Sequence, residues 1–160
     1  MSGIINSAGS RSGVIGTTEL DYEEGIWTVT AVDEGGGATF TLDSSYNTGS
    51  YVKIGNLVTV QGVIKFDTPS DTGTGNLEIY LPFTSKTGLT DASDDSNLCL
   101  GGFDEDWDAW TGKTPYAILN AGTNYFIMRA SDGATQAGSG YMSSYVNNDS
   151  LLSFSGSYRV

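Results

Sequence analysis

The sequence predicts an all-β domain, either an antiparallel β-sandwich or a jelly roll, preceded by an extended N-terminal arm. Glu, Lys, Gln and Arg, which usually cover helix surfaces, are sparse, whereas Gly occurs 22 times among 160 residues. Short runs of alternating apolar and polar residues recur every roughly 8–20 residues between Gly- and Thr-rich turns, as in antiparallel sandwiches. We expect about nine strands in one domain over residues 21–160.

Residues 1–20 are rich in Gly and Ser and are too polar to build a core of their own. Two apolar pairs interrupt this segment, Ile4-Ile5 and Val14-Ile15, and a simple linker would need neither pair. We therefore expect an extended arm that docks on another protein through these four side chains. A free terminus without a partner is the alternative.

The domain begins with a predicted hairpin. The β-branched and aromatic run Ile26–Val32 is expected to turn at Gly35-Gly36-Gly37 and to pair with Ala38–Leu42. The polar residues Ser44–Gly49 are then expected to form a turn.

A second hairpin is predicted around Gly55-Asn56, two residues that tolerate a positive φ. It joins Ser50–Ile54 to the long strand Leu57–Phe66. The side-chain period of two separates the long strand into two faces. One face carries Val58, Val60, Gly62, Ile64 and Phe66, and the other carries Leu57, Thr59, Gln61, Val63 and Lys65. Gly62 indicates a bulge or a close packing contact.

The second half of the chain alternates strands with polar loops. One short helix is possible within residues 131–148, although the glycines there argue against a long one. The remaining predicted strands are Asn76–Leu81, Asn97–Phe103, Tyr116–Leu119, Tyr125–Ala130 and Leu151–Val160.

Composition excludes several functions. The formal net charge is −12, from 7 basic and 19 acidic residues, so neither nucleic acid nor an anionic membrane is an expected partner. No apolar run reaches about 18 residues and no signal peptide is evident, so membrane insertion is not expected. Histidine is absent, which removes the commonest general base and metal ligand. We expect no enzymatic activity, no catalytic residue and no cofactor.

Three aspartates at alternate positions, Asp104, Asp106 and Asp108, match the first ligands of a helix-loop-helix calcium loop. That loop needs Gly at its sixth position and Glu at its twelfth, but this chain has Ala109 and Pro115 there. The motif therefore fails, and these carboxylates remain only weak metal candidates beside the interpretation of a solvated loop.

The same loop and the strand after it carry three aromatic residues, Trp107, Trp110 and Tyr116. Aromatic rings stack on sugars and nearby carboxylates accept hydrogen bonds from sugar hydroxyls, so these residues are candidates for carbohydrate binding. The alternative is that the rings anchor a long loop or fill a subunit interface.

Two groups of residues resemble modules of bacteriophage tail fibres and virion surfaces. The segment 10–25 leading into Trp27-Thr28 is similar to the start of such modules, where Pro usually follows Trp-Thr and Val29 stands here. The run Tyr51-Val-Lys-Ile-Gly-Asn56, together with Leu81-Pro-Phe83 and Tyr158-Arg-Val160, resembles the β-sandwich tips of phage fibres. The resemblance covers roughly residues 10–83 and the last strand.

This resemblance implies a non-enzymatic structural protein of the virion surface, commonly a homotrimer, that contacts other virion proteins. It would be made in the host cytoplasm and released on lysis. Because the sequence starts at Met1 with almost no shaft, we expect a short surface protein attached through its arm. Two alternatives remain open: a tip that recognises a host surface glycan, and a capsid decoration protein that cements the particle.

Overall fold

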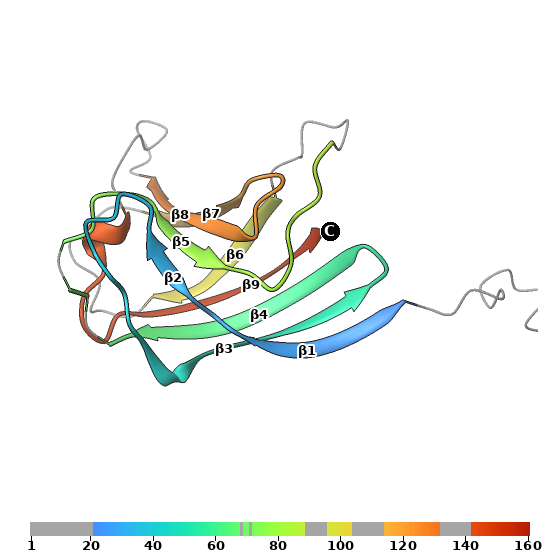
Figure 1. The fold of residues 1–160 in the computed structure, drawn as a ribbon, viewed down its shortest axis with the longest axis horizontal. Helices are drawn as coiled ribbons and strands as arrows, with labels where there is room; N and C mark the ends of the chain where they lie inside the picture. The colour runs from blue at the N-terminus through green and yellow to red at the C-terminus, as the bar shows by residue number, and fades with distance from the viewer. Residues whose placement is uncertain (1–20, 68, 71, 89–95, 104–113, 132–141) are drawn as a thin grey trace, which may run out of the picture.

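The computed structural model describes residues 21–67, 69–70, 72–88, 96–103, 114–131 and 142–160. These residues form a β-sandwich of two antiparallel layers (Figure 1). The first layer, sheet A, contains β1 (Tyr22–Thr28), β3 (Leu42–Ile54), β4 (Leu57–Phe66) and β9 (Leu151–Arg159). The second layer, sheet B, contains β2 (Ala31–Asp33), β5 (Leu77–Tyr80), β7 (Thr114–Leu119) and β8 (Tyr125–Ser131).

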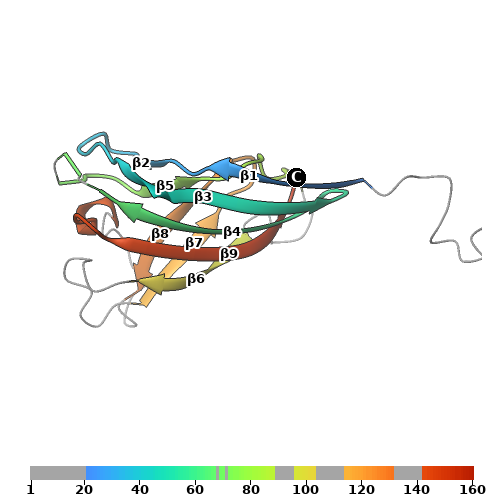
Figure 2. The same cartoon turned by 90° about the horizontal axis from the view of Figure 1, so that it is seen from below.

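The strand β6 (Ser96–Phe103) joins the two layers. Its first residues, Ser96 to Leu98, pair with β7 in sheet B, and its later residues pair with β9 in sheet A. The strand order is therefore β1-β3-β4-β9-β6-β7-β8-β5-β2, a continuous sheet folded over on itself. The strands of sheet B cross behind those of sheet A when the molecule is seen from below (Figure 2).

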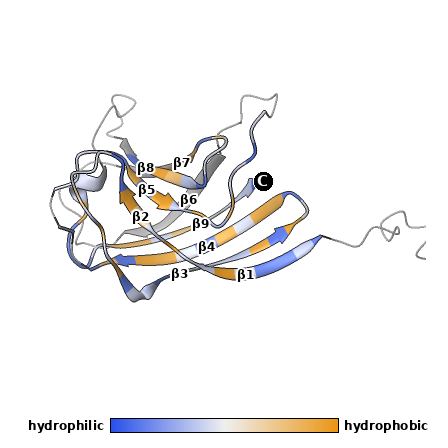
Figure 3. Cartoon of the chain, viewed as in Figure 1, coloured by the Kyte–Doolittle hydropathy of each residue, from blue (hydrophilic) through white to orange (hydrophobic). Residues whose placement is uncertain are grey.

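The core fills the space between the layers. Hydrophobic residues recur along β4, β5, β7 and β8, which line this space (Figure 3). Phe126 of sheet B contacts Phe154 of sheet A, with ring centroids 5.1 Å apart. The largest side chains that are less than 2% exposed come from both layers and the connections between them: Val29, Val58, Ile64, Phe66, Leu77, Ile79, Leu119, Phe126, Met128, Leu152 and Tyr158.

The hairpin predicted around Gly55-Asn56 is confirmed. Ile54 faces Leu57 across the turn, and Gly55 adopts a φ of 59°. The predicted close contact at Gly62 is also confirmed, because a Cβ at this position would lie 2.6 Å from the Phe154 ring. The glycine thus leaves room for the tip of the Phe154 ring against β4.

The first predicted hairpin is wrong. Ile26–Val32 is divided between the layers, with β1 pairing with β3 and β2 pairing with β5. The carboxylate of Asp33 accepts hydrogen bonds from the N–H groups of Gly37 and Ala38, at 2.8 and 3.0 Å, so these amides cannot pair back onto β2. Residues 38–41 are consequently irregular.

The turn predicted at Ser44–Gly49 is also wrong, because β3 runs through it. Gly49 explains this outcome: the Trp27 ring of β1 lies directly against its Cα, where any Cβ would collide. The five later strands are confirmed to within a few residues as β5, β6, β7, β8 and β9, and the short helix is a 3-10 turn at Met142–Tyr145.

Candidate functional site

The motif residues that lie far apart in the sequence meet at the end of the sandwich that carries the β3–β4 turn. The Tyr158 hydroxyl donates a hydrogen bond to the Phe83 carbonyl at 3.1 Å. The Tyr51 ring meets the Phe83 ring edge-on, with centroids 5.0 Å apart. The Val160 N–H donates to the Asn56 carbonyl at 2.9 Å. We call these five residues the latch, because they fasten the chain after β5 and the C-terminal strand to the turn.

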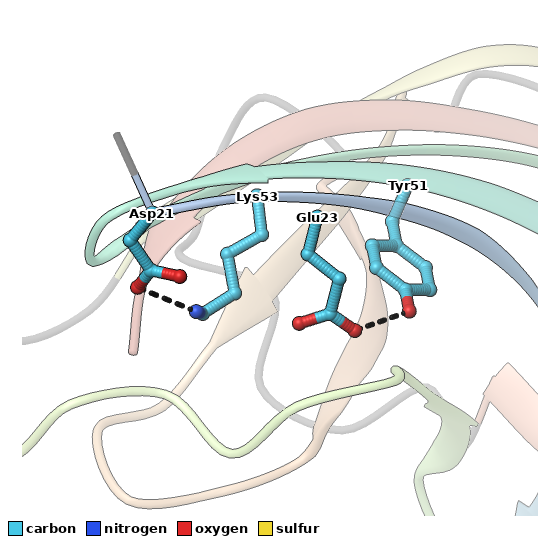
Figure 4. Close-up of polar contacts among 4 residues, drawn as sticks. All are labelled: Asp21, Glu23, Tyr51 and Lys53. Carbon is cyan, nitrogen blue, oxygen red and sulfur yellow. Dashed lines mark hydrogen bonds and ion pairs between the residues drawn. The ribbon is translucent and has the colours of Figure 1, made fainter. Parts of the chain in front are cut away.

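Two polar pairs extend the latch along the same end of sheet A (Figure 4). The Lys53 ammonium lies 3.2 Å from the Asp21 carboxylate, and the Tyr51 hydroxyl donates to Glu23 at 2.7 Å. The hydrogen bond to Glu23 raises the pKa of Tyr51, so the phenol stays protonated. The side chains of Tyr51, Lys53 and Tyr158 thus each have a partner within the fold, which gives these three motif residues a structural role.

Asp33 is a buried carboxylate that organises two loops. It is 3% exposed and accepts hydrogen bonds from backbone N–H groups of its own loop and of the loop before β5, including Gly75 at 2.7 Å. Burial alone would raise the pKa of this carboxyl, but donors led by Thr74 and Ser143 outweigh burial and lower the pKa to about 2. With its oxygens occupied, Asp33 is a structural anion.

The outer face of sheet B carries a cluster of one carboxylate and two phenols. Tyr80 and Tyr125 face each other across β5 and β8, with ring centroids 5.4 Å apart. Glu78, one pair further along the same face, is 7% exposed and accepts a hydrogen bond from Tyr80 at 3.4 Å. Burial, and then the negative charge of Glu34, raise the pKa of Glu78 above its ordinary value. We call Glu78, Tyr80 and Tyr125 the tyrosine cluster.

Tyr116 is the predicted sugar-binding residue whose side chain the structure describes. It lies on β7 opposite Arg129, and the alternation of β7 and β8 places both residues on the outer face that holds the tyrosine cluster. The other predicted site residues lie outside the described residues: Trp107 and Trp110 for sugar, Asp104, Asp106 and Asp108 for metal, and Ile4, Ile5, Val14 and Ile15 for docking.

The outer face of sheet A is the second candidate surface. Paired residues form rows across its strands, and the central row consists of Ile26, Ser50, Gln61 and Ser155. Two shallow grooves of about 510 and 630 Å³ flank this row, and all four residues contribute to both grooves. The face therefore combines recesses with a projecting isoleucine.

Within the described ranges, no three Asp, Glu or Cys residues gather closely enough to hold a metal ion. No helix among the described residues has the length and hydropathy needed to cross a membrane.

Sequence reasoning missed both outer faces, although a signal for each was present. Alternation that points Leu77 and Ile79 inward necessarily points Glu78 and Tyr80 outward. The alternation of β4 identifies its outward residues, but it does not connect the apolar ones with Ile26, because that connection depends on the pairing of β1 with β3.

One solved structure with the same fold is the crystal structure of the Dettilon tailspike protein, gp208. It superposes with a TM-score of 0.70 and 24% sequence identity over 86% of this chain. The chain spans about a quarter of that protein, since the match covers 24% of its length. No family model and no curated protein matches the sequence.

Proposed function

We propose that this chain is a structural module of a bacteriophage tail, exposed on the virion surface and without catalytic activity. The observation that carries the proposal is the fold shared with part of a tailspike protein over 86% of the chain. The latch supports it independently, because it is built from the residues by which the sequence resembles phage fibre tips. As in the sequence-based expectation, the module would be a homotrimer that is made in the host cytoplasm and released on lysis.

Attachment would use residues 1–20 as a docking arm. Asp21, the first described residue, lies at the end of the molecule that carries the β3–β4 turn (Figure 1), where its carbonyl accepts a hydrogen bond from Gly55 N–H at 2.7 Å. The five latch residues that fasten this end all lie outside the arm. The sandwich should therefore tolerate removal of the arm.

The test is a phage that encodes the chain without residues 1–20. The truncated protein should keep its circular dichroism spectrum and melting temperature but be missing from purified particles, as judged by mass spectrometry. A matched control replaces the four apolar arm residues by Ser at full length and should behave like the truncation. Normal incorporation of either variant would refute attachment through the arm.

The absence of catalysis is proposed on the disposition of the buried carboxylates. Glycoside hydrolysis needs two carboxyl groups that flank the scissile bond within one cleft, about 5–10 Å apart. Asp33 and Glu78 belong to adjacent strands, but Asp33 pairs with Leu77 whereas Glu78 pairs with Val32, so they point to opposite faces of sheet B. Purified chain incubated with host polysaccharide should release no reducing ends. Release that is lost in Glu78→Gln would overturn this part of the proposal.

Glycan recognition is a second candidate function, favoured by the outer face of sheet B. The tyrosine cluster offers two rings and a carboxylate, and Tyr116 and Arg129 extend the same face. A glycan array should show binding that is lost in Tyr80→Ala/Tyr125→Ala. The pair Trp107→Ala/Trp110→Ala tests the predicted loop in parallel. An array on which the unmodified chain binds nothing would refute this function and leave the structural role standing.

A further inference from the structure

The outer face of sheet A concentrates the exposed apolar side chains of this protein. Of the eight large apolar residues found exposed in the described ranges, seven lie on this face: Tyr22, Ile26, Tyr46, Val52, Ile54, Leu57 and Val63. The eighth is Val32 on β2, in the other layer. A monomer rarely exposes so many apolar side chains on one sheet face, and such patches usually mark an interaction surface.

The shape of the face is self-complementary. Ile26 is 75% exposed, the largest value among these residues, and stands on the edge strand β1. The two grooves beside it are floored by short side chains, Ser50 and Ser155, and one of them is bordered by Val63. The same surface thus presents both a projecting side chain and the recesses that could receive one. In a contact between two copies of this chain, Ile26 of one copy could therefore enter a recess of the other copy.

Part of the polar surface of this face can be covered at little cost, because four of its side chains already form hydrogen-bonded pairs. Gln61 donates to the Ser50 hydroxyl at 3.1 Å, and the hydroxyls of Thr59 and Ser157 are 2.8 Å apart. Burial of a polar group is costly mainly when it lacks a hydrogen-bond partner. An apolar side chain lying over these pairs would leave them intact.

Charge distinguishes this face from the rest of the molecule. The chain carries a net charge of −12, so two copies repel each other over most of their surfaces. The rows of the outer face contain only three charged residues, Glu24, Lys65 and Arg159, with a net charge of +1 (one acidic and two basic). Lys65 and Arg159 lie at the ends of the face, where Lys65 is paired with Asp149 at 2.6 Å, and Glu24 borders one of the two grooves beside Ile26. The central rows are therefore a surface on which another acidic copy meets little repulsion.

We propose that the outer face of sheet A is the interface between copies of this chain, with Ile26 of one copy seated over Ser50 and Ser155 of the next. This inference names the contact surface of the proposed homotrimer, and in that respect it deepens the proposed function. It concerns association in solution, so it can fail while the virion role stands.

The experiment measures association of the full chain by sedimentation velocity and light scattering between 1 and 100 µM, as concentrations chosen to span ordinary subunit affinities. Ile26→Glu should weaken association at least 100-fold, because it places a charge in the centre of the interface. Ser155→Arg should weaken it similarly by filling the recess. Val32→Lys is the control: it also places a charge at an exposed apolar position on an edge strand, opposite the acidic Glu78, and it should associate like the unmodified chain.

A charge-swap variant tests the contact itself. In Ile26→Glu/Ser155→Arg, the new carboxylate of one copy would face the new guanidinium of the next, so association should return in 50 mM NaCl and weaken again in 500 mM NaCl, where charges are screened over about 4 Å instead of about 14 Å. The unmodified chain should show the opposite trend and associate equally or more tightly in high salt, because screening relieves the repulsion between acidic copies.

Three results would overturn the inference: a monomeric unmodified chain at 100 µM, an oligomer unaffected by either face variant, or association of the unmodified chain that weakens tenfold in high salt. A monomer that still enters particles would refute this interface and leave the virion role intact. An oligomer of the expected behaviour that is missing from particles would support the interface and refute the virion role.

Discussion

Replacing Asp33 by Asn tests how a single buried carboxylate holds two loops in place. The carboxylate accepts backbone hydrogen bonds from Gly35, Gly37 and Ala38 on one side and from Thr74 and Gly75 on the other. Asn has nearly the same shape, but it is uncharged and has one acceptor oxygen in place of two. The substitution therefore removes the charge without creating a cavity.

The magnitude follows from the lowered pKa of Asp33, about 2 in the folded protein against an ordinary value of 3.8. Because one pKa unit corresponds to about 1.4 kcal/mol, ionised Asp33 contributes roughly 2–3 kcal/mol to the free energy of unfolding at pH 7. A lowered pKa means that this contribution is present above pH 3.8 and is lost as the pH falls through about 2. It should be about 1 kcal/mol at pH 3 and well under about 1 kcal/mol at pH 2.

The assay is urea denaturation of both proteins at pH 7, 3 and 2, and the measured quantity is the difference between their free energies of unfolding. Asp43→Asn is the matched control, because Asp43 accepts one backbone hydrogen bond, from Ser45 at 2.8 Å, and should cost no more than about 0.5 kcal/mol. A difference for Asp33→Asn that is constant from pH 7 to pH 2 would refute the reasoning, since it would show that the loss does not depend on the charge.

Three further predictions concern single side chains. Gly62→Ala places a Cβ 2.6 Å from the Phe154 ring and should cost about 1–3 kcal/mol of unfolding free energy. The double variant Gly62→Ala/Phe154→Leu should lose less unfolding free energy than the sum of the two single losses, and additive losses would contradict the contact. Tyr158→Phe removes the bond to the Phe83 carbonyl and should cost about 1 kcal/mol. Since burial raises the pKa of Tyr158 to about 12, this cost should shrink between pH 10 and 12, and a constant cost would argue against the burial. Glu78→Gln relieves a carboxylate whose pKa is raised, so its melting temperature should equal that of the unmodified chain at pH 4 and exceed it at pH 7; a lower value at pH 7 would show that the carboxylate stabilises the fold.

Local signals in the sequence were sufficient for the parts of the fold that depend on neighbouring residues. The β3–β4 hairpin, the strands β7 and β8 and the last strand follow from alternation and from turn residues such as Gly55. The split of Ile26–Val32 between layers could not be predicted in this way. This split depends on the contact of Trp27 with Gly49 and on the hydrogen bonds that Asp33 accepts from a loop about 40 residues further along the chain.

The candidate surfaces were predictable only in part for the same reason. Tyr116 could be chosen from its residue type, and the structure places it on the outer face of sheet B. The tyrosine cluster depends on the pairing of β5 with β8, which are about 50 residues apart in the chain. The rows on sheet A likewise combine β1, β3, β4 and β9, so no local window contains the pattern.

The two outer faces lie on opposite sides of the sandwich, and this arrangement relates the proposed interface to the proposed sugar site. An assembly that buries the outer face of sheet A around its axis would turn the outer face of sheet B, with Tyr80 and Tyr125, towards solvent in every copy. Shallow aromatic platforms bind single sugars weakly, but several copies held in a fixed geometry bind a repeated surface glycan with much higher avidity. The Ile26→Glu variant should therefore bind glycan much more weakly than the unmodified chain does, although the substituted residue lies in the other layer. Equal avidity of the monomeric variant and the oligomer would separate the two faces functionally.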